Sequence, residues 1–237
     1  MPFIAYPYLP NFVRLSHSED GKTTLCAEVY IYEGNTLIDS GSPANTPSLV
    51  SCLNTLHISP LSIERVILSH THFDHFGDLS YFPNATVYIG PKSLDNLMKN
   101  PLDALDASFR YNVLSAKEES EWLVENMSSF RLESIEKLNL KEHKTKEEFA
   151  QSNGLSYLVA AGHTDEDLLF SYRQYRMFGD SLSFRGHHGP HSAFGIARYL
   201  MKNHPELMIL KSHSGKPSET LSQMGSPVSS SGESHTL

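Results

Sequence analysis

The sequence predicts an α+β protein whose short strands end in histidine or aspartate residues. A β-hairpin pattern at residues 25–39 comes first, and a helical spacing with a following strand comes next. Short apolar strands return after residue 155, and polar residues follow most of them. Strand ends that share one edge of a packed pair of sheets would bring these polar side chains together.

The first elements are a hairpin, a helix and a strand. Leu25–Tyr32 and Thr36–Asp39 are rich in β-branched and aromatic residues and flank a turn at Glu33–Asn35, which predicts the hairpin. Apolar residues recur through Pro47–His57 at the three- and four-residue spacing of a helix. A strand at Arg65–Leu68 follows.

The middle of the chain is more charged and more helical. A short strand is predicted at Ala85–Ile89 and a helix at Lys92–Lys99. Ser115 and Thr145 each stand three residues before a glutamate, a capping-box pattern that marks the start of a helix. We therefore expect a partly helical insertion at about residues 91–150 that covers one side of a site.

Strands and a helix return in the last third. The pattern predicts a strand, a hairpin, a helix and a final strand, at Leu155–Ala160, Asp167–Tyr172 with Tyr175–Phe178, Ser192–Asn203 and Glu206–Leu210. Beyond residue 213 the composition becomes serine-rich, and it buries too little apolar surface to offset the entropy of ordering. We predict one domain over residues 1–213 and a disordered tail over 214–237.

Bulk composition favours a small-molecule enzyme. The formal net charge of −8 argues against a nucleic-acid-binding surface, which is normally basic. Cys26 and Cys52 form no Cys-x-x-Cys pair, and each is expected to be a small buried apolar residue. The sequence shows no secretory signal. It also has no apolar stretch close to the length of about 20 residues that a membrane span needs. We expect a cytoplasmic protein without nucleic-acid or membrane partners, and the composition leaves its oligomeric state open.

The most informative segment is His70-Thr-His72-Phe-Asp74-His75, directly after the strand that ends near Leu68. It offers three imidazoles and one carboxylate as metal ligands. Ligands of these types bind zinc, iron or manganese. On a tight loop they can converge on one metal ion or divide between two.

Three further ligand-type residues, His163, Asp180 and His213, follow later strands. Asp180 is suited to bridge two metal ions because its carboxylate has two oxygens to share. A bridged pair of ions can hold a hydroxide that is nucleophilic near neutral pH, since a metal lowers the pKa of bound water towards about 7.

The pattern resembles the metallo-β-lactamase-fold superfamily, which includes glyoxalase II, lactonases, persulfide dioxygenases and RNA-processing nucleases. His-x-His-x-Asp-His, Gly-His-Thr, Gly-Asp-Ser and a late histidine occur here in the family order. An earlier Ile-Asp-Ser-Gly that ends at Gly41 resembles the family's Ile-Asp-Thr-Gly segment. The resemblance implies an αββα sandwich, in which two mixed β-sheets are flanked by helices and metals lie at one sheet edge.

The same resemblance assigns the ligands to two divalent ions, with zinc expected and iron or manganese as alternatives. The first ion would be held by His70, His72 and His163. The second would be held by Asp74, His75 and His213. Asp180 would lie between the ions. Asp39 would lie behind the ligands and orient either one of them or the loop. Asp74 would also act catalytically by taking or giving a proton.

The chain departs from the family pattern in places and adds a histidine-rich loop. Asp165 follows Gly-His-Thr where hydrolases of the superfamily often have Pro-Gly, and Ser212 replaces the glycine that usually precedes the late histidine. Candidates for substrate contacts lie directly before the helix predicted at Ser192–Asn203. They are Phe184, Arg185, His187, His188 and His191. Arg185 is suited to pair with a substrate carboxylate. A solvated loop is the alternative for the three histidines.

The leading hypothesis is a metal-dependent hydrolase that directs a metal-bound hydroxide at the carbonyl of a small ester, lactone or thioester. Ser183 stands where some lactonases of the superfamily place a catalytic tyrosine. One alternative is a mononuclear iron persulfide dioxygenase with His70, His163 and Asp180 as ligands. Another is a non-catalytic metal-binding member of the fold.

Overall fold

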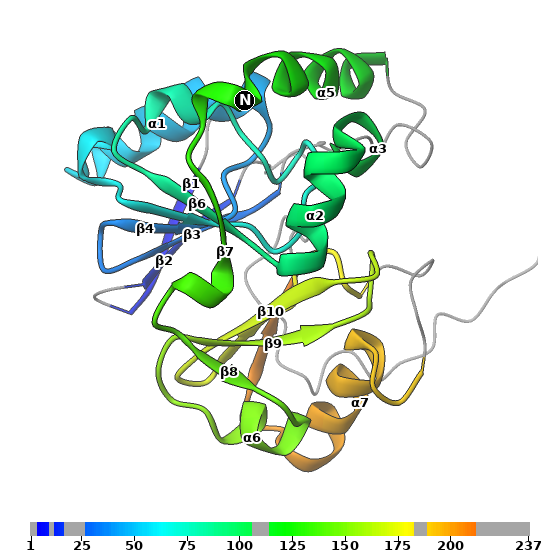
Figure 1. The fold of residues 1–237 in the computed structure, drawn as a ribbon. Coiled ribbons are helices and arrows are strands. Elements are labelled where there is room, and N and C mark those ends of the chain that lie inside the picture. The colour runs from blue at the N-terminus through cyan, green and yellow to red at the C-terminus, as the bar shows by residue number, and fades with distance from the viewer. Residues whose placement is uncertain (1–3, 10–11, 17–26, 106–113, 183–188, 212–237) are drawn as a thin grey trace, which may run out of the picture.

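The computed structural model describes residues 4–9, 12–16, 27–105, 114–182 and 189–211 of the chain. Two β-sheets lie face to face, and helices cover the outer face of each (Figure 1). The layers therefore run helix, sheet, sheet, helix. This αββα sandwich confirms the predicted fold class.

The first sheet is half antiparallel and half parallel. Its antiparallel part consists of β1 (Ile4–Leu9), β2 (Phe12–Ser16), β3 (Val29–Tyr32) and β4 (Thr36–Ile38). Its parallel part continues from β4 into β5 (Arg65–Ile67), β6 (Thr86–Ile89) and β7 (Leu132–Ser134). The predicted hairpin is β3–β4, and Glu33 and Gly34 in its turn have positive φ angles.

The second sheet is also mixed, as expected. Its described strands are β8 (Lys141–His143), β9 (Ser156–Ala160), β10 (Asp167–Tyr172), β11 (Tyr175–Met177) and β12 (Met208–Leu210). The strands lie in the order β12-β11-β10-β9-β8. The outer pairs are parallel, whereas β9, β10 and β11 are antiparallel.

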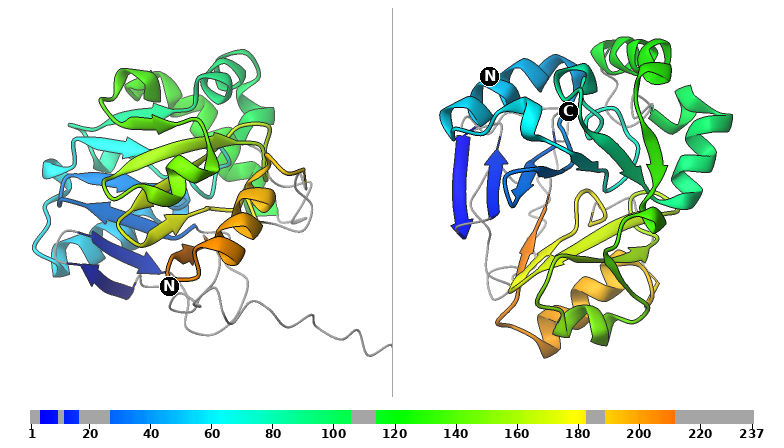
Figure 2. Two further views of the ribbon diagram at one scale, coloured as in Figure 1. Left: turned by 90° about the horizontal axis from the view of Figure 1, so that it is seen from below. Right: turned by 60° about the vertical axis from the view of Figure 1, so that its left-hand side comes forward.

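Helices cover the outer faces of both sheets (Figure 2). On the first sheet lie α1 (Thr46–Thr55), α2 (Pro91–Lys99), α3 (Pro101–Leu105) and α5 (Leu114–Asn126). On the second lie α6 (Lys146–Gln151) and α7 (Ala193–Asn203). In the described part of the chain, helices are too short or too polar to cross a membrane.

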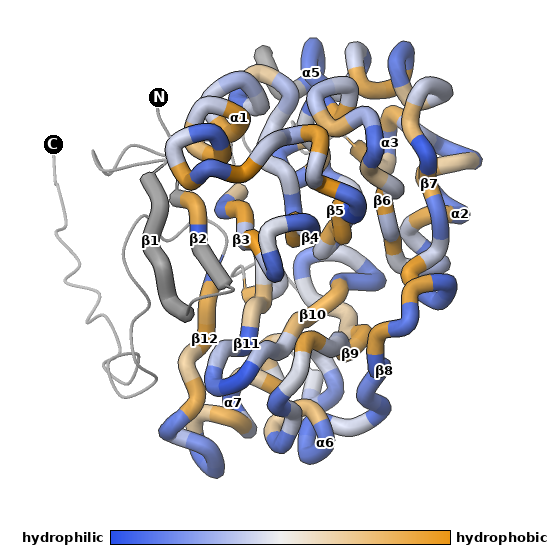
Figure 3. The backbone as a smooth tube through the Cα atoms, turned by 90° about the vertical axis from the view of Figure 1, so that its left-hand side faces the viewer, coloured by the Kyte–Doolittle hydropathy of each residue, from blue (hydrophilic) through white to orange (hydrophobic). Residues whose placement is uncertain are grey.

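Alternating strand residues build three separate apolar cores. In β5, Val66 packs against the helices over the first sheet, whereas Ile67 packs between the two sheets. Val87 and Tyr88 divide in the same way in β6. Figure 3 shows hydrophobic residues along the strands of both sheets. A third core lies between the second sheet and its helices. Each layer therefore packs against the next through buried apolar side chains.

The expected insertion at residues 91–150 is only partly an insertion. Helices α2, α3 and α5 belong to it, but β7 and β8 are edge strands of the two sheets. Helix α5 begins at Leu114, so Ser115 lies inside it and is not its N-cap, contrary to the capping-box prediction. Thr145, in contrast, forms the predicted capping box with Glu148 at the start of α6.

Some predictions concern residues that the structure does not describe. Cys52 is buried as expected, whereas Cys26 lies outside the described residues. The boundary predicted at residue 213 and the serine-rich tail also lie outside them. The extent of the domain and the state of the tail therefore stay predictions.

Candidate metal centre

The ends of β5, β9 and β11 bring most of the predicted ligands to one edge of the sandwich. The His70–His75 segment follows β5 in the first sheet, whereas His163 and Asp180 follow β9 and β11 in the second. All these ligand side chains are buried. The Leu168 amide donates a 2.8 Å hydrogen bond to the Ser69 carbonyl, which joins the two sheets at this edge.

Three imidazole nitrogens converge at the centre of this group. Nε2 of His70 lies 3.1 Å from Nδ1 of His72. Nε2 of His163 lies 3.0 Å from the same Nδ1 atom. The rings of His70 and His163 are steeply inclined to that of His72, at 80° and 82°, so the nitrogens approach one point from different directions.

This nitrogen set fits a divalent metal ion. Two nitrogens that each lie about 2.1 Å from one zinc at the tetrahedral angle are about 3.4 Å apart, close to the separations seen here. An imidazole nitrogen has either one in-plane lone pair or one N–H, so hydrogen bonds alone cannot join Nδ1 of His72 to both neighbours. Burial and the neighbouring imidazoles hold the pKa of His70 well below its ordinary value, so its lone pair is available to a metal.

Asp180 connects this trio to a second group. Its Oδ2 atom lies 3.8 Å from Nε2 of His163 and 3.6 Å from Nε2 of His75. One ligand atom each from His70, His75 and Asp180 can be chosen so that all lie within 4.8 Å of one another. Asp180 therefore lies between the two groups, where a bridging carboxylate was predicted.

The second group carries an excess of negative charge. Burial alone would lower the pKa of His75, but the carboxylates of Asp39, Asp74 and Asp180 outweigh burial and raise that pKa well above its ordinary value. Oδ2 of Asp74 lies 3.9 Å from Nε2 of His75. Three buried carboxylates around one imidazole favour a cation, which can be a proton or a divalent metal ion.

Asp39 lies behind His75, as the family resemblance implies. Its Oδ2 accepts a hydrogen bond from Nδ1 of His75 at 2.9 Å, which leaves Nε2 directed toward the centre. The amide and the hydroxyl of Ser69 also donate to the Asp39 carboxylate, at 2.7 and 2.9 Å. Ser69 was not among the predicted site residues, and its position directly before His70 was its only signal in the sequence.

Asp167 holds the loop of His163, a role that was also not predicted from the sequence. Its carboxylate accepts from the His163 amide at 2.6 Å and from the Thr164 amide at 3.1 Å. A Cβ atom on Gly162 would lie 2.5 Å from Oδ2 of Asp167, so the loop requires glycine there. The signal was an aspartate a few residues after the loop, a type that commonly bonds to nearby amides.

Two glutamates tie the helical layer to the loops of the centre. Oε2 of Glu166 accepts from the Ser93 amide in the first turn of α2, at 2.7 Å. Oε2 of Glu119 in α5 accepts from the Ala44 amide at 3.0 Å, in the segment that follows Asp39. Burial raises the pKa of Glu119. Glu166 stands within the segment where related hydrolases often have Pro-Gly. The residue that departs from the family pattern here therefore connects the loop of His163 to α2.

Most of the remaining predicted site residues lie outside the part of the chain that the structure describes. His213, Phe184, Arg185, His187 and His188 lie outside the described part of the chain. His191 is exposed and directly precedes Ser192, the N-cap of α7. The roles assigned to all of them stay predictions.

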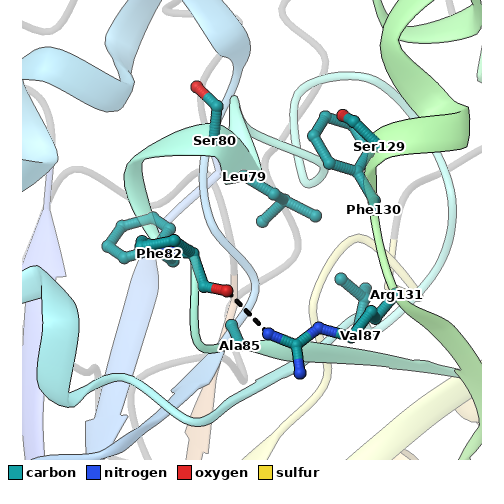
Figure 4. Close-up of a pocket in the computed structure, with 9 residues that line it drawn as sticks. Leu79, Ser80, Phe82, Ala85, Val87, Ser129, Phe130 and Arg131 are labelled. Atoms are coloured by element: carbon teal, nitrogen blue, oxygen red, sulfur yellow. Dashed lines mark hydrogen bonds between the residues drawn. The ribbon is translucent and has the colours of Figure 1, made fainter.

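A cavity of about 240 Å³ lies between η3 (Leu79–Tyr81) and the segment before β7 (Figure 4). Its lining includes none of the predicted ligands. Arg131 at its mouth donates to the Pro83 carbonyl at 2.7 Å. Phe130 in its wall packs edge-on against Phe76, the neighbour of His75, with ring centroids 5.9 Å apart. The cavity thus belongs to the core between the helices and the first sheet.

Comparison with solved structures gives the same fold. A β-lactamase domain protein from Burkholderia ambifaria matches with a TM-score of 0.58 and 14% identity, over 92% of this chain and 70% of that one. The dizinc quorum-quenching lactonase AidC matches with a TM-score of 0.56 and 15% identity, over 90% of each chain. The mono-zinc form of the metallo-β-lactamase FIM-1 from Pseudomonas aeruginosa matches at 0.55 and 13%, over 93% of this chain and 90% of that one.

Sequence comparison identifies the family. Metallo-beta-lactamase domain-containing protein 1 of Rattus norvegicus is 33% identical over 76 residues. That match covers 32% of this chain and 30% of the rat protein. The family model of the metallo-beta-lactamase superfamily matches residues 27–201, which include most of the predicted ligands. This match spans most of the chain, and the fold agrees with it, so the chain belongs to the metallo-β-lactamase superfamily and has its hydrolase-like fold.

Proposed function

We propose that the protein is a metal-dependent hydrolase that acts on the carbonyl group of a small ester, lactone or thioester. The observation that carries this proposal is the convergence of His70, His72 and His163, with nitrogens 3.0–3.1 Å apart. We assign these residues to a first divalent ion, for which zinc is the expected metal. Asp74, His75 and His213 are assigned to a second ion, with Asp180 between the two.

Divalent ions held by these residues would lower the pKa of a water molecule towards about 7 and would polarise a carbonyl oxygen. The residues of the chain would supply the remaining parts of the chemistry. Asp39 holds the His75 ring through Nδ1 at 2.9 Å and so fixes its orientation. Asp74, buried beside His75, is proposed to take the proton of the attacking water and to return it to the leaving group.

The choice of a small carbonyl substrate rests on two supports. The net charge of −8 disfavours a nucleic acid as substrate. The lactonase AidC shares the fold across 90% of this chain, which is compatible with a lactone substrate. Location in the cytoplasm is retained as a prediction from the sequence.

Metal analysis tests the site assignment. We expect purified protein to hold two zinc ions per chain, His72→Ala to lose the first ion and Asp180→Ala to hold one ion at most. His57→Asn is a matched control, because this histidine is exposed, belongs to neither group of candidate ligands and has a positive φ angle that asparagine tolerates. Unchanged metal content in both His72→Ala and Asp180→Ala would overturn the assignment.

Turnover assays on an ester, a lactone and a thioester test the reaction. Hydrolysis that is abolished by a chelator and restored by zinc supports the proposal. A single bound iron with sulfur-dependent oxygen consumption would instead indicate a persulfide dioxygenase. Full metal content without turnover of any of the three substrates would indicate a non-catalytic binding protein.

A further inference from the structure

The residues that alternate with the ligands in the His70–His75 segment bind the helical layer. The Thr71 hydroxyl donates to the Ala104 carbonyl at 2.9 Å. The Phe73 amide donates to the Leu105 carbonyl, also at 2.9 Å. The ligand segment is therefore held from behind by the last two residues of α3.

These contacts use carbonyl groups that a helix leaves open. The last four carbonyls of a helix have no partner within it, and burial makes an unmade hydrogen bond costly. Ala104 and Leu105 are both buried, as are Thr71 and Phe73. The end of α3 and the ligand segment thus satisfy each other's hydrogen-bonding groups in a buried contact.

His72 lies between the two hydrogen bonds. It presents Nδ1 to the centre, whereas His70 and His163 present Nε2. Nδ1 is closer to the backbone than Nε2, so its position follows the backbone closely and ring rotation can correct it less. The His75 amide bonds to the His72 carbonyl at 3.0 Å and closes the turn on the other side.

We infer that Thr71 is a positioning residue for the first metal ion, acting through the carbonyl end of α3. It holds the backbone on one side of His72 while the Phe73 amide holds the other. The inference rests on the proposed metal-binding function. It assigns a role in metal binding to a helix that contributes no ligand.

The test compares Thr71→Val with Thr71→Ser. Valine keeps the shape of threonine but removes the hydroxyl, whereas serine keeps the hydroxyl. We expect Thr71→Val to weaken zinc binding at the first site by about 10-fold, because partners behind metal ligands typically contribute 10–100-fold. The visible spectrum of the Co²⁺-loaded protein should change as well. Thr71→Ser should restore both the affinity and the spectrum.

Thermal melting separates positioning from general stability. If Thr71 positions His72, Thr71→Val lowers the melting temperature more in zinc than in EDTA, because the variant has lost binding energy as well. An equal loss in both conditions, with wild-type zinc affinity, would overturn the inference and leave the metal site intact. Absence of zinc binding in the wild type would overturn the proposed function instead.

Hydrogen exchange on the wild type keeps the inference testable if Thr71→Val does not fold. Coupling between the ion and the α3 contacts is reciprocal, so removal of zinc must weaken those contacts. We expect the Phe73 amide to exchange faster in EDTA, while the Leu97 amide in α2 serves as the reference. Equal protection of Phe73 with and without zinc would refute the inference.

Discussion

Asp39 is held in a backbone conformation that few residues adopt. Its φ angle is 58°, in the left-handed region where aspartate and asparagine are the commonest residues after glycine. The side chain is buried and accepts from the Ser69 amide, the Ser69 hydroxyl and Nδ1 of His75. A residue kept in such a conformation by its surroundings commonly marks a functional site.

We predict that Asp39→Asn weakens the second metal ion without displacing the first. Asparagine tolerates the same backbone angle, but its amide group cannot accept from every donor that faces Asp39. The affinity for the second ion should fall by about 10–100-fold. Titration with a competing chelator measures this, and Asp95→Asn, an exposed residue of α2, is the control. Two ions bound with wild-type affinity would contradict the role of Asp39.

At the scale of elements, β8, β9 and β10 share a buried polar cluster. Nε2 of His143 lies 2.9 Å from the Ser156 hydroxyl, and this hydroxyl lies 2.6 Å from that of Ser171. The cluster resembles a serine–histidine pair of the kind used in catalysis. All three residues are buried, however, and the His143 ring faces Phe149 of α6 at 6.1 Å. The cluster therefore joins three strands and has no access for a substrate.

His143 should make folding depend on pH. Burial lowers its pKa in the folded state, whereas the unfolded chain has an ordinary histidine pKa of about 6.5. Between these two values the unfolded state binds more protons, so the free energy of unfolding should fall as the pH drops below about 6.5.

Urea unfolding of the metal-free protein between pH 5 and 8 measures this dependence. EDTA removes any bound metal ion, so that loss of metal at low pH does not contribute to the measured change in stability. His143→Asn should unfold more easily at pH 8 but show a shallower pH dependence than the wild type. An identical slope in the two proteins would show that His143 does not contribute.

How far the sequence predicted these elements depends on how local their signals are. The β3–β4 hairpin, α1 and α7 carry turn residues or helical spacing within their own segments, and their prediction was correct. β1 was missed because Pro7 argues against a strand, although an edge strand tolerates proline, and the pairing shifts register between Pro7 and Leu9. β7 and β8 are only three residues long, too short for a recognisable alternation.

In the candidate site, too, features with a local sequence signal could be predicted, whereas features that depend on distant residues could not. The candidate ligands of His70–His75 are contiguous, so the sequence alone is enough to predict them as a group. The contacts of Ser69, Asp167 and Glu119 join segments distant in the sequence or depend on one exact loop shape. No spacing rule predicts such contacts, so most of the residues that support the candidate ligands could not be predicted from the sequence.

At the scale of the whole molecule, the centre connects the two sheets. His70, His72 and His75 come from the first sheet, whereas His163 and Asp180 come from the second. A bound ion therefore holds both sheets and is expected to bind the folded chain far better than the unfolded one. This selective binding stabilises the fold by mass action.

Metal removal should accordingly lower the melting temperature. A ligand at 100 times its dissociation constant contributes about 2.7 kcal/mol, which corresponds to roughly 5–10 °C for a chain of this size. Thermal melting with zinc, with EDTA and after zinc is restored measures the shift. His72→Ala should show a smaller shift than the wild type. A melting temperature that does not respond to EDTA would contradict a metal shared between the sheets.

The strands of the two sheets come from separate parts of the chain. In the described residues, every strand of the first sheet precedes residue 135, and every strand of the second follows residue 140. The molecule is thus two consecutive halves of one chain, each with its own helices, and the connection between them is short. Neither half carries a complete set of ligands. Since the candidate ligands come from both halves, a chain cut at 135–140 is expected to bind metal only while its two fragments stay docked.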